Sequence, residues 1–140
     1  MTHRSSLMIL IAALVLMTAS VVFAATPALT GTWKISVPSK SASGEPCPFV
    51  PDGIQFFKDQ TVSLSNIGNQ RLPYKTELSA AEKKAIETRI PEFKGKNILL
   101  IKLAPNMEWT ATPMAYAYTI TKGELTLILK GWSPATFVQK

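Results

Sequence analysis

Residues 115–130 read AYAYTITKGELTLILK and carry the most regular pattern in the chain. Large apolar side chains occupy alternate positions of 115–121 and again of 124–130, on either side of the pair Lys122-Gly123. A period of two indicates a β-strand with one buried face, and a two-residue link that contains Gly is typical of a hairpin turn. The segment therefore predicts an antiparallel hairpin whose two strands share one apolar face.

Short segments with a similar pattern surround this hairpin. They cover residues 32–37, 54–58, 61–65, 72–78, 97–103, 108–112 and 135–138. In the first of them Trp33, Ile35 and Val37 are expected to share one face, and Asp59-Gln60 is expected to form the turn after the second. Residues 38–53, which are rich in proline, form a long extended connection. About eight strands at this spacing predict a β-barrel or a β-sandwich.

One helix is predicted in the middle of the chain. Ser79 and Glu82 have the spacing of a capping box, in which a hydroxyl and a carboxylate each accept a hydrogen bond from a free backbone N–H at the start of a helix. Residues 80–90 are mostly good helix formers, and Pro91 ends the run. The predicted fold class is therefore mainly β, an antiparallel barrel or sandwich with one short helix.

The N-terminus has the form of a secretory signal peptide. Arg4 supplies the positive charge, residues 7–17 form an apolar core, and small residues precede the expected cleavage site. We therefore expect residues 1–24 to be removed, so that residues 25–140 act as one domain in the periplasm or outside the cell. The alternative is an uncleaved membrane anchor, because residues 7–25 have nearly the length needed to span a bilayer.

The composition excludes several kinds of catalyst. The chain is 17% charged, has 15 Lys and Arg against 9 Asp and Glu, and contains one histidine and one cysteine. His3 falls in the leader, so the domain lacks Ser–His and Cys–His pairs and histidine ligands for a metal. No spacing brings two carboxylates together for acid–base chemistry. We therefore predict that the domain is not an enzyme and uses no cofactor or metal.

Cys47 lies between Pro46 and Pro48. Catalysis by its thiol is disfavoured because no histidine can activate it. Two interpretations stay open: an inert, partly buried thiol, and a thiol that forms an intermolecular disulfide or responds to redox conditions.

Three motifs together resemble the lipocalins, and in particular small bacterial lipocalin-like domains. GTW at 31–33 is similar to the G-x-W motif of lipocalins, residues 54–62 resemble the first hydrophobic hairpin of those domains, and residues 118–127 resemble their C-terminal hairpin. The resemblance covers most of residues 29–140. It implies a lipocalin-like antiparallel β-barrel of about eight strands, with Trp33 as a plug at one end.

The first functional hypothesis is an exported, non-enzymatic protein that binds a small apolar or lipid ligand. An eight-stranded barrel has an interior that side chains can fill or that one small ligand can occupy. Aromatic and methionine side chains would line a ligand site, although the same side chains could form a packed core. The residues expected to line the site are Met107, Trp109, Met114, Tyr116 and Tyr118.

The second hypothesis is a protein-interaction module of the cell envelope, either an inhibitor or an assembly factor. Its contact would be the 38–53 connection or a basic patch of Lys83, Lys84, Lys94 and Lys96 near the helix. A net charge of +6 favours an anionic surface or an acidic partner, whereas export disfavours nucleic acid. The alternative for the patch is a solvated face, and the oligomeric state does not follow from the sequence.

Overall fold

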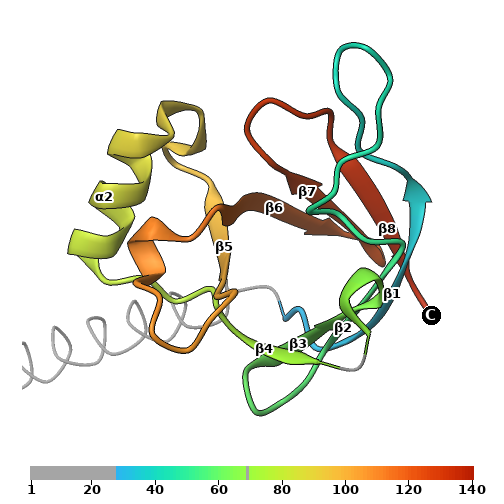
Figure 1. Cartoon of the computed structure of the whole chain (residues 1–140), viewed down its shortest axis with the longest axis horizontal. Helices are drawn as coiled ribbons and strands as arrows, with labels where there is room; N and C mark the ends of the chain where they lie inside the picture. Colours follow the sequence, from blue (N-terminus) through green and yellow to red (C-terminus); the bar gives the residue numbers. More distant parts are fainter. Residues whose placement is uncertain (1–27, 69) are drawn as a thin grey trace, which may run out of the picture.

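The structure is a computed structural model, and it describes residues 28–68 and 70–140 (Figure 1). The predicted signal peptide, residues 1–24, lies outside the described residues.

The described chain forms a mainly β fold, a closed barrel of eight antiparallel strands in which each strand pairs with the next and the last pairs with the first. The strands are β1 (Gly31–Val37), β2 (Gly53–Phe56), β3 (Thr61–Leu64), β4 (Arg71–Lys75), β5 (Asn97–Ile101), β6 (Met114–Thr121), β7 (Glu124–Ile128) and β8 (Ala135–Gln139). This architecture confirms the predicted fold class.

The hairpin predicted from residues 115–130 is present as β6 and β7. Thr121 pairs with Glu124, and both linking residues have left-handed backbone conformations, with φ of 50° at Lys122 and 77° at Gly123. Positive φ at both positions defines a type I′ turn, whose twist matches that of the two strands. The hairpin between β2 and β3 is also confirmed, and its last loop residue, Gln60, has φ of 63°.

Two sequence predictions are corrected. Residues 108–112 were expected to form a strand, but Trp109–Ala111 form a short 3-10 helix, η3. The neighbouring β5 already pairs with β4 and β6, so no strand edge is left for this segment. The prediction that Val37 shares a buried face with Trp33 was also wrong: Val37 is 53% exposed, because the pairing of β1 with β8 shifts register between Ile35 and Val37.

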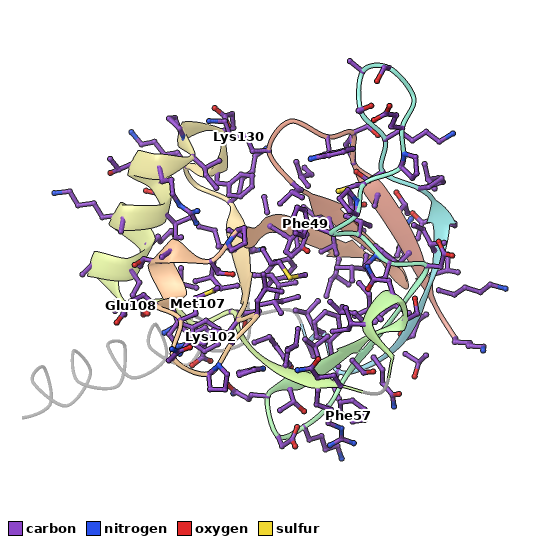
Figure 2. The ribbon with its side chains drawn as sticks, in the orientation of Figure 1. Phe49, Phe57, Lys102, Met107, Glu108 and Lys130 are labelled. Atoms are coloured by element: carbon purple, nitrogen blue, oxygen red, sulfur yellow. The ribbon has the colours of Figure 1, made fainter. Side chains whose placement is uncertain are left out.

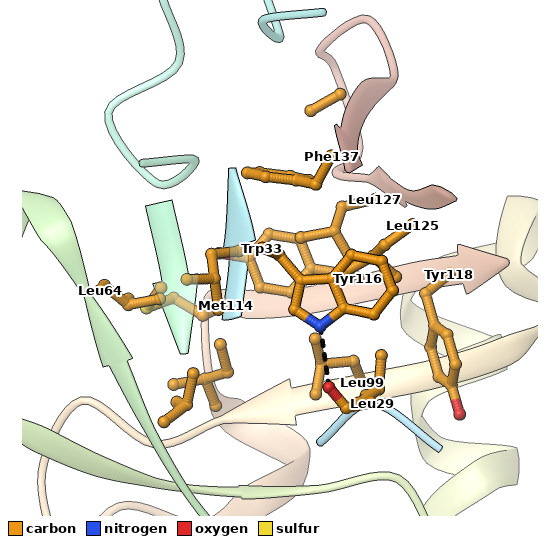
Figure 3. Packing of buried hydrophobic residues seen from close by; sticks show 14 of the residues in the cluster. Leu29, Trp33, Leu64, Leu99, Met114, Tyr116, Tyr118, Leu125, Leu127 and Phe137 are labelled. Atoms are coloured by element: carbon orange, nitrogen blue, oxygen red, sulfur yellow. Dashed lines mark hydrogen bonds between the residues drawn. The ribbon is translucent and has the colours of Figure 1, made fainter. Parts of the chain in front are cut away.

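Trp33 lies in the barrel core and is 2% exposed. Its indole Nε1 donates a hydrogen bond of 2.8 Å to the backbone carbonyl of Leu29, just before β1. Figure 3 shows the indole packed among core side chains that include Met114 and Tyr116. Leu29 is itself buried, so the segment before β1 contributes to the core at this end of the strand.

The connection that follows β1 contributes to the core from the other end of that strand. In Figure 1 it first projects from the barrel and then runs back across the strands. Cys47 is buried in the core cluster, and half-buried Val50 packs against the same cluster. The hydroxyl of Tyr116 donates a hydrogen bond of 2.6 Å to the carbonyl of Phe49. Residues 47–51 therefore form a covering segment that is attached to the barrel interior.

The helix α2 (Ala80–Arg89) packs on the outside of the barrel (Figure 1). The predicted capping box is confirmed: the Glu82 N–H donates to the Ser79 hydroxyl, and the Ser79 N–H donates to the Glu82 carboxylate. A second apolar cluster joins the helix and the following 3-10 turn, η2 (Pro91–Phe93), to the outer faces of β5 and β6. Its buried members are Ile86, Ile90, Phe93, Ile98, Leu100, Ala115 and Ala117.

Candidate functional site

The structure divides the five residues that were expected to line a ligand site. Met114, Tyr116 and Tyr118 are buried together in the barrel core. Trp109 belongs instead to the outer cluster beside α2, where the ammonium groups of Lys75 and Lys102 lie 5.2 and 4.5 Å from its ring centre. Met107 lies on the connection between β5 and β6, away from Phe49 in the view of Figure 2, and is half-buried.

The interior positions of the barrel are occupied by large aromatic side chains. Trp33, Phe56, Tyr116 and Phe137 are each almost fully buried and belong to one packed cluster. The rings of Phe56 and Tyr74 meet edge to face, with centres 5.0 Å apart. Close packing of this kind is typical of a protein core.

A groove with a volume of about 280 Å³ lies on the outside of the barrel. Four separate segments form it: the covering segment, the end of α2, the start of β6 and the connection between β7 and β8. The residues that line it are Phe49, Arg89, Ile90, Pro113, Ala115, Leu129, Lys130 and Trp132. Lys130 lies on the β7–β8 connection, on the side nearer to α2 in Figure 2, and Phe49 lies over the barrel.

Local sequence explains the shape of this groove. Ala115 faces outward from β6, and its small side chain leaves space that a larger residue would fill. After β7 the chain makes a turn in which the backbone N–H of Trp132 donates to the Leu129 carbonyl at 3.1 Å. Gly131 in this turn has a φ of 88°. This turn places Leu129 and Trp132 on the same side of the groove.

Hydrogen bonds between Ser133 and the start of the β1–β2 connection hold two of these segments together. The Ser39 hydroxyl donates to the Ser133 carbonyl at 2.5 Å, and the Lys40 N–H donates to the Ser133 hydroxyl at 2.8 Å. The Ser133 N–H in turn donates to the Lys40 carbonyl at 2.9 Å. The walls that carry Trp132 and Phe49 therefore belong to two connections that are linked to each other.

The groove is positively charged. Arg89 and Lys130 line it, and none of the eight lining residues is acidic. In the part of the chain that the structure describes, the ion pairs are Arg71–Asp59 and Lys75–Glu82, so neither groove cation takes part in one. An Nη atom of Arg89 donates to the backbone carbonyl of Thr112 at 3.0 Å, which fixes the guanidinium against the wall.

Burial affects the phenols of both core tyrosines, Tyr116 and Tyr118. Burial raises the pKa of the Tyr116 phenol well above its usual range, and burial also raises the pKa of Tyr118. Both phenols therefore stay protonated at neutral pH. Buried Cys47 lies close enough to Tyr116 to reinforce the rise in its pKa. This environment suits packing and hydrogen bonding.

The four lysines of the predicted basic patch lie on two consecutive elements. Lys83 and Lys84 are exposed on α2, and Lys94 and Lys96 are exposed on the segment that leads to β5. Glu87 and Glu92 lie between the two pairs of lysines in the sequence, and the backbone N–H of Gly95 donates to Glu87 at 3.3 Å.

Across residues 28–68 and 70–140, no three His, Cys, Asp or Glu side chains are grouped so that they could hold a metal ion. Within the same ranges, no helix is both long and apolar enough to cross a membrane.

The closed eight-stranded barrel is compatible with a lipocalin-like fold. Comparisons with known protein families, curated proteins and solved structures gave no match.

No motif in the sequence pointed to this groove. Phe49 is an exposed aromatic residue in a connection, which is a usable signal for binding, whereas Trp132 is half-buried. No periodicity relates the four segments, because barrel closure and the packing of α2 bring them together.

Proposed function

We propose that this chain is an exported, non-enzymatic, lipocalin-like protein that binds a small apolar ligand in the groove between α2 and the β7–β8 connection. The observation that carries the proposal is an open groove with Phe49, Leu129 and Trp132 in its lining, placed on a closed barrel. Large apolar side chains that line a hollow stabilise an apolar ligand by about 25 cal/mol for each Å² removed from water.

The groove is a better ligand site than the space around Met114, Tyr116 and Tyr118. Those side chains are already buried against one another, so a ligand among them would have to displace packed atoms. Phe49, by contrast, is 37% exposed and can lose water-accessible area to a ligand without any rearrangement of the core.

The tryptophans provide a direct test, because each of the three reports on a different region. Trp33 lies in the core, Trp109 beside α2 and Trp132 in the groove. We would titrate the chain without its first 24 residues with hydrocinnamyl alcohol, a neutral apolar probe, and follow the indole N–H signals by NMR. The proposal requires the Trp132 signal to move with saturation while the Trp33 signal stays fixed.

A pair of variants controls the assignment. Trp132→Ala removes one wall of the groove and should weaken binding of the alcohol about tenfold, measured through the Leu129 amide signal. Trp109→Ala removes an indole outside the groove and should leave the affinity unchanged. Saturating movement of Trp33 alone would place the ligand in the barrel interior, and no movement of any indole would contradict a binding function for such molecules.

A contact with another envelope protein is the second candidate, favoured by the projecting part of the β1–β2 connection. A bridge between Lys40 and Pro46 closes this loop, and residues 42–45 at its tip are exposed.

The exposed lysines 83, 84, 94 and 96 would attract an acidic partner. Changing these four lysines to Glu would abolish a steered protein contact and leave binding of the neutral alcohol unchanged.

A further inference from the structure

We infer that the ligand of the groove is a small organic acid, with an aromatic body and one carboxylate. This inference rests on the proposed function, because it specifies the ligand of the same groove. Two aromatic side chains, Phe49 and Trp132, line the groove together with two cations, Arg89 and Lys130. The aromatic residues favour a flat apolar body, and the cations favour a negative charge at its end.

Arg89 is arranged to receive the carboxylate. Its guanidinium has five N–H donors in a planar fork, and one bond to the Thr112 carbonyl holds it in place. That bond is the only side-chain hydrogen bond of Arg89 among the described residues, which leaves further donors for a ligand. An arginine held by a backbone carbonyl loses little conformational freedom when it binds a carboxylate.

Lys130 supplies the second positive charge, from the β7–β8 connection. It is exposed and takes part in no ion pair within the described part of the chain. A lysine ammonium at the rim adds attraction without fixed geometry, so we expect Arg89 to determine affinity more than Lys130 does.

The volume of the groove limits the size of the acid. At about 280 Å³ it lies just below the usual range of pockets that hold drug-sized molecules, roughly 300–1,000 Å³. A single ring with a short acidic chain suits that space, whereas a lipid with two acyl chains does not.

The test compares two probes with the same phenyl ring and chain length, hydrocinnamate, which ends in a carboxylate, and hydrocinnamyl alcohol, which ends in a neutral hydroxyl. In the unmodified protein the acid should bind about tenfold more tightly than the alcohol, as read from the Trp132 indole signal. Arg89→Gln should remove most of that preference, measured as the ratio of the affinities for acid and alcohol in the same variant. Lys130→Gln should reduce it less, and Lys34→Gln, which removes an exposed charge on β1, should not change it.

Each remaining outcome has a defined meaning. Equal affinity for acid and alcohol would overturn this inference and leave the proposed function intact. Failure of both probes to move the Trp132 signal would overturn both. Movement of that signal by vesicles of anionic phospholipid, but not by hydrocinnamate, would show a membrane-surface contact and overturn the inference. The preference for the acid should also decrease as salt is added, because the two cations are exposed.

Discussion

The hydroxyl of Tyr116 donates a hydrogen bond of 2.6 Å to the backbone carbonyl of Phe49. Tyr116 belongs to the barrel core and Phe49 to the lining of the groove, so this bond connects the two regions. The same bond gives a buried phenol its partner, as a buried polar group requires.

Tyr116→Phe should destabilise the protein by about 1–2 kcal/mol, because the Phe49 carbonyl loses its donor. Urea denaturation at neutral pH measures the change in free energy of unfolding. Tyr74→Phe serves as the control, since no hydrogen bond of the Tyr74 hydroxyl is present among the described residues, and it should cost less than about 0.5 kcal/mol. Equal losses in the two variants would show that the Tyr116 bond contributes little.

Alkaline pH should destabilise the fold through the phenol of Tyr116. Burial raises the pKa of the Tyr116 phenol above its ordinary value of 10.0, so the phenol ionises in the unfolded chain before it ionises in the fold. The stability that the protonated Tyr116 phenol contributes is fully present below about pH 10. Above that pH the free energy of unfolding falls by ~1.4 kcal/mol per pH unit for this one proton. Urea denaturation between about pH 8 and pH 11 should therefore show a steeper decline for the unmodified protein than for Tyr116→Phe.

Acid pH should destabilise the start of α2 through protonation of the Glu82 carboxylate. Hydrogen bonds from the Lys75 ammonium and from the Ser79 backbone hold the pKa of the Glu82 carboxyl below its ordinary value of 4.5. The contribution of Glu82 is therefore present above about pH 4.5 and is lost as the pH falls through the lower pKa of the fold. Glu82→Gln keeps the capping geometry but not the charge, so it should cost about 0.5–1 kcal/mol at pH 7. The difference from the unmodified protein should shrink as the pH falls below about 4.5 and through the lowered pKa; a constant difference would exclude the carboxylate charge as its cause.

The turn between β6 and β7 offers a stabilising substitution. Lys122 has φ of 50°, a left-handed conformation that Asn adopts more readily than Lys. Lys122→Asn should raise the free energy of unfolding by about 0.5–1 kcal/mol, measured by urea denaturation. The neighbouring variant Gly123→Ala should have the opposite sign and cost about 1 kcal/mol, because φ at Gly123 is 77°. A loss of stability in Lys122→Asn would mean that the Lys122 side chain has a role of its own.

The strands and the helix could be predicted from the sequence because their information is local, whereas closure into a barrel depends on the distant pairing of β1 with β8. Alternation over 115–130 and the capping box at Ser79 each depend on neighbouring residues alone, and both were confirmed. Residues 108–112 have the alternation of a half-buried strand, yet tertiary bonds decide their structure. The Thr112 hydroxyl donates to the Ile101 carbonyl at 2.5 Å and accepts from the Met114 N–H at 3.2 Å.

The groove could not be predicted in the same way. Its lining joins Phe49, Arg89, Ala115 and Trp132, which are far apart in the sequence and meet only because α2 packs on the outer face of β6. A hydrophobic pattern shows that a side chain is to be buried, but not which other segment will cover it. Aromatic and methionine residues were therefore taken as the ligand site, although the structure packs Met114, Tyr116 and Tyr118 into the core.

Cys47 can report on movement of the covering segment, residues 47–51. The residue is 5% exposed, so iodoacetamide should alkylate its thiol at least about a hundredfold more slowly in the native protein than in the unfolded chain. Tyr116→Phe removes the bond to Phe49 and should speed native alkylation several-fold, because the segment can then open without unfolding of the barrel. Gly123→Ala gives a similar loss of global stability in a distant turn, and its alkylation rate should match that of the unmodified protein. Equal acceleration in both variants would mean that the thiol is exposed only when the whole barrel unfolds, and would contradict local opening beside the groove.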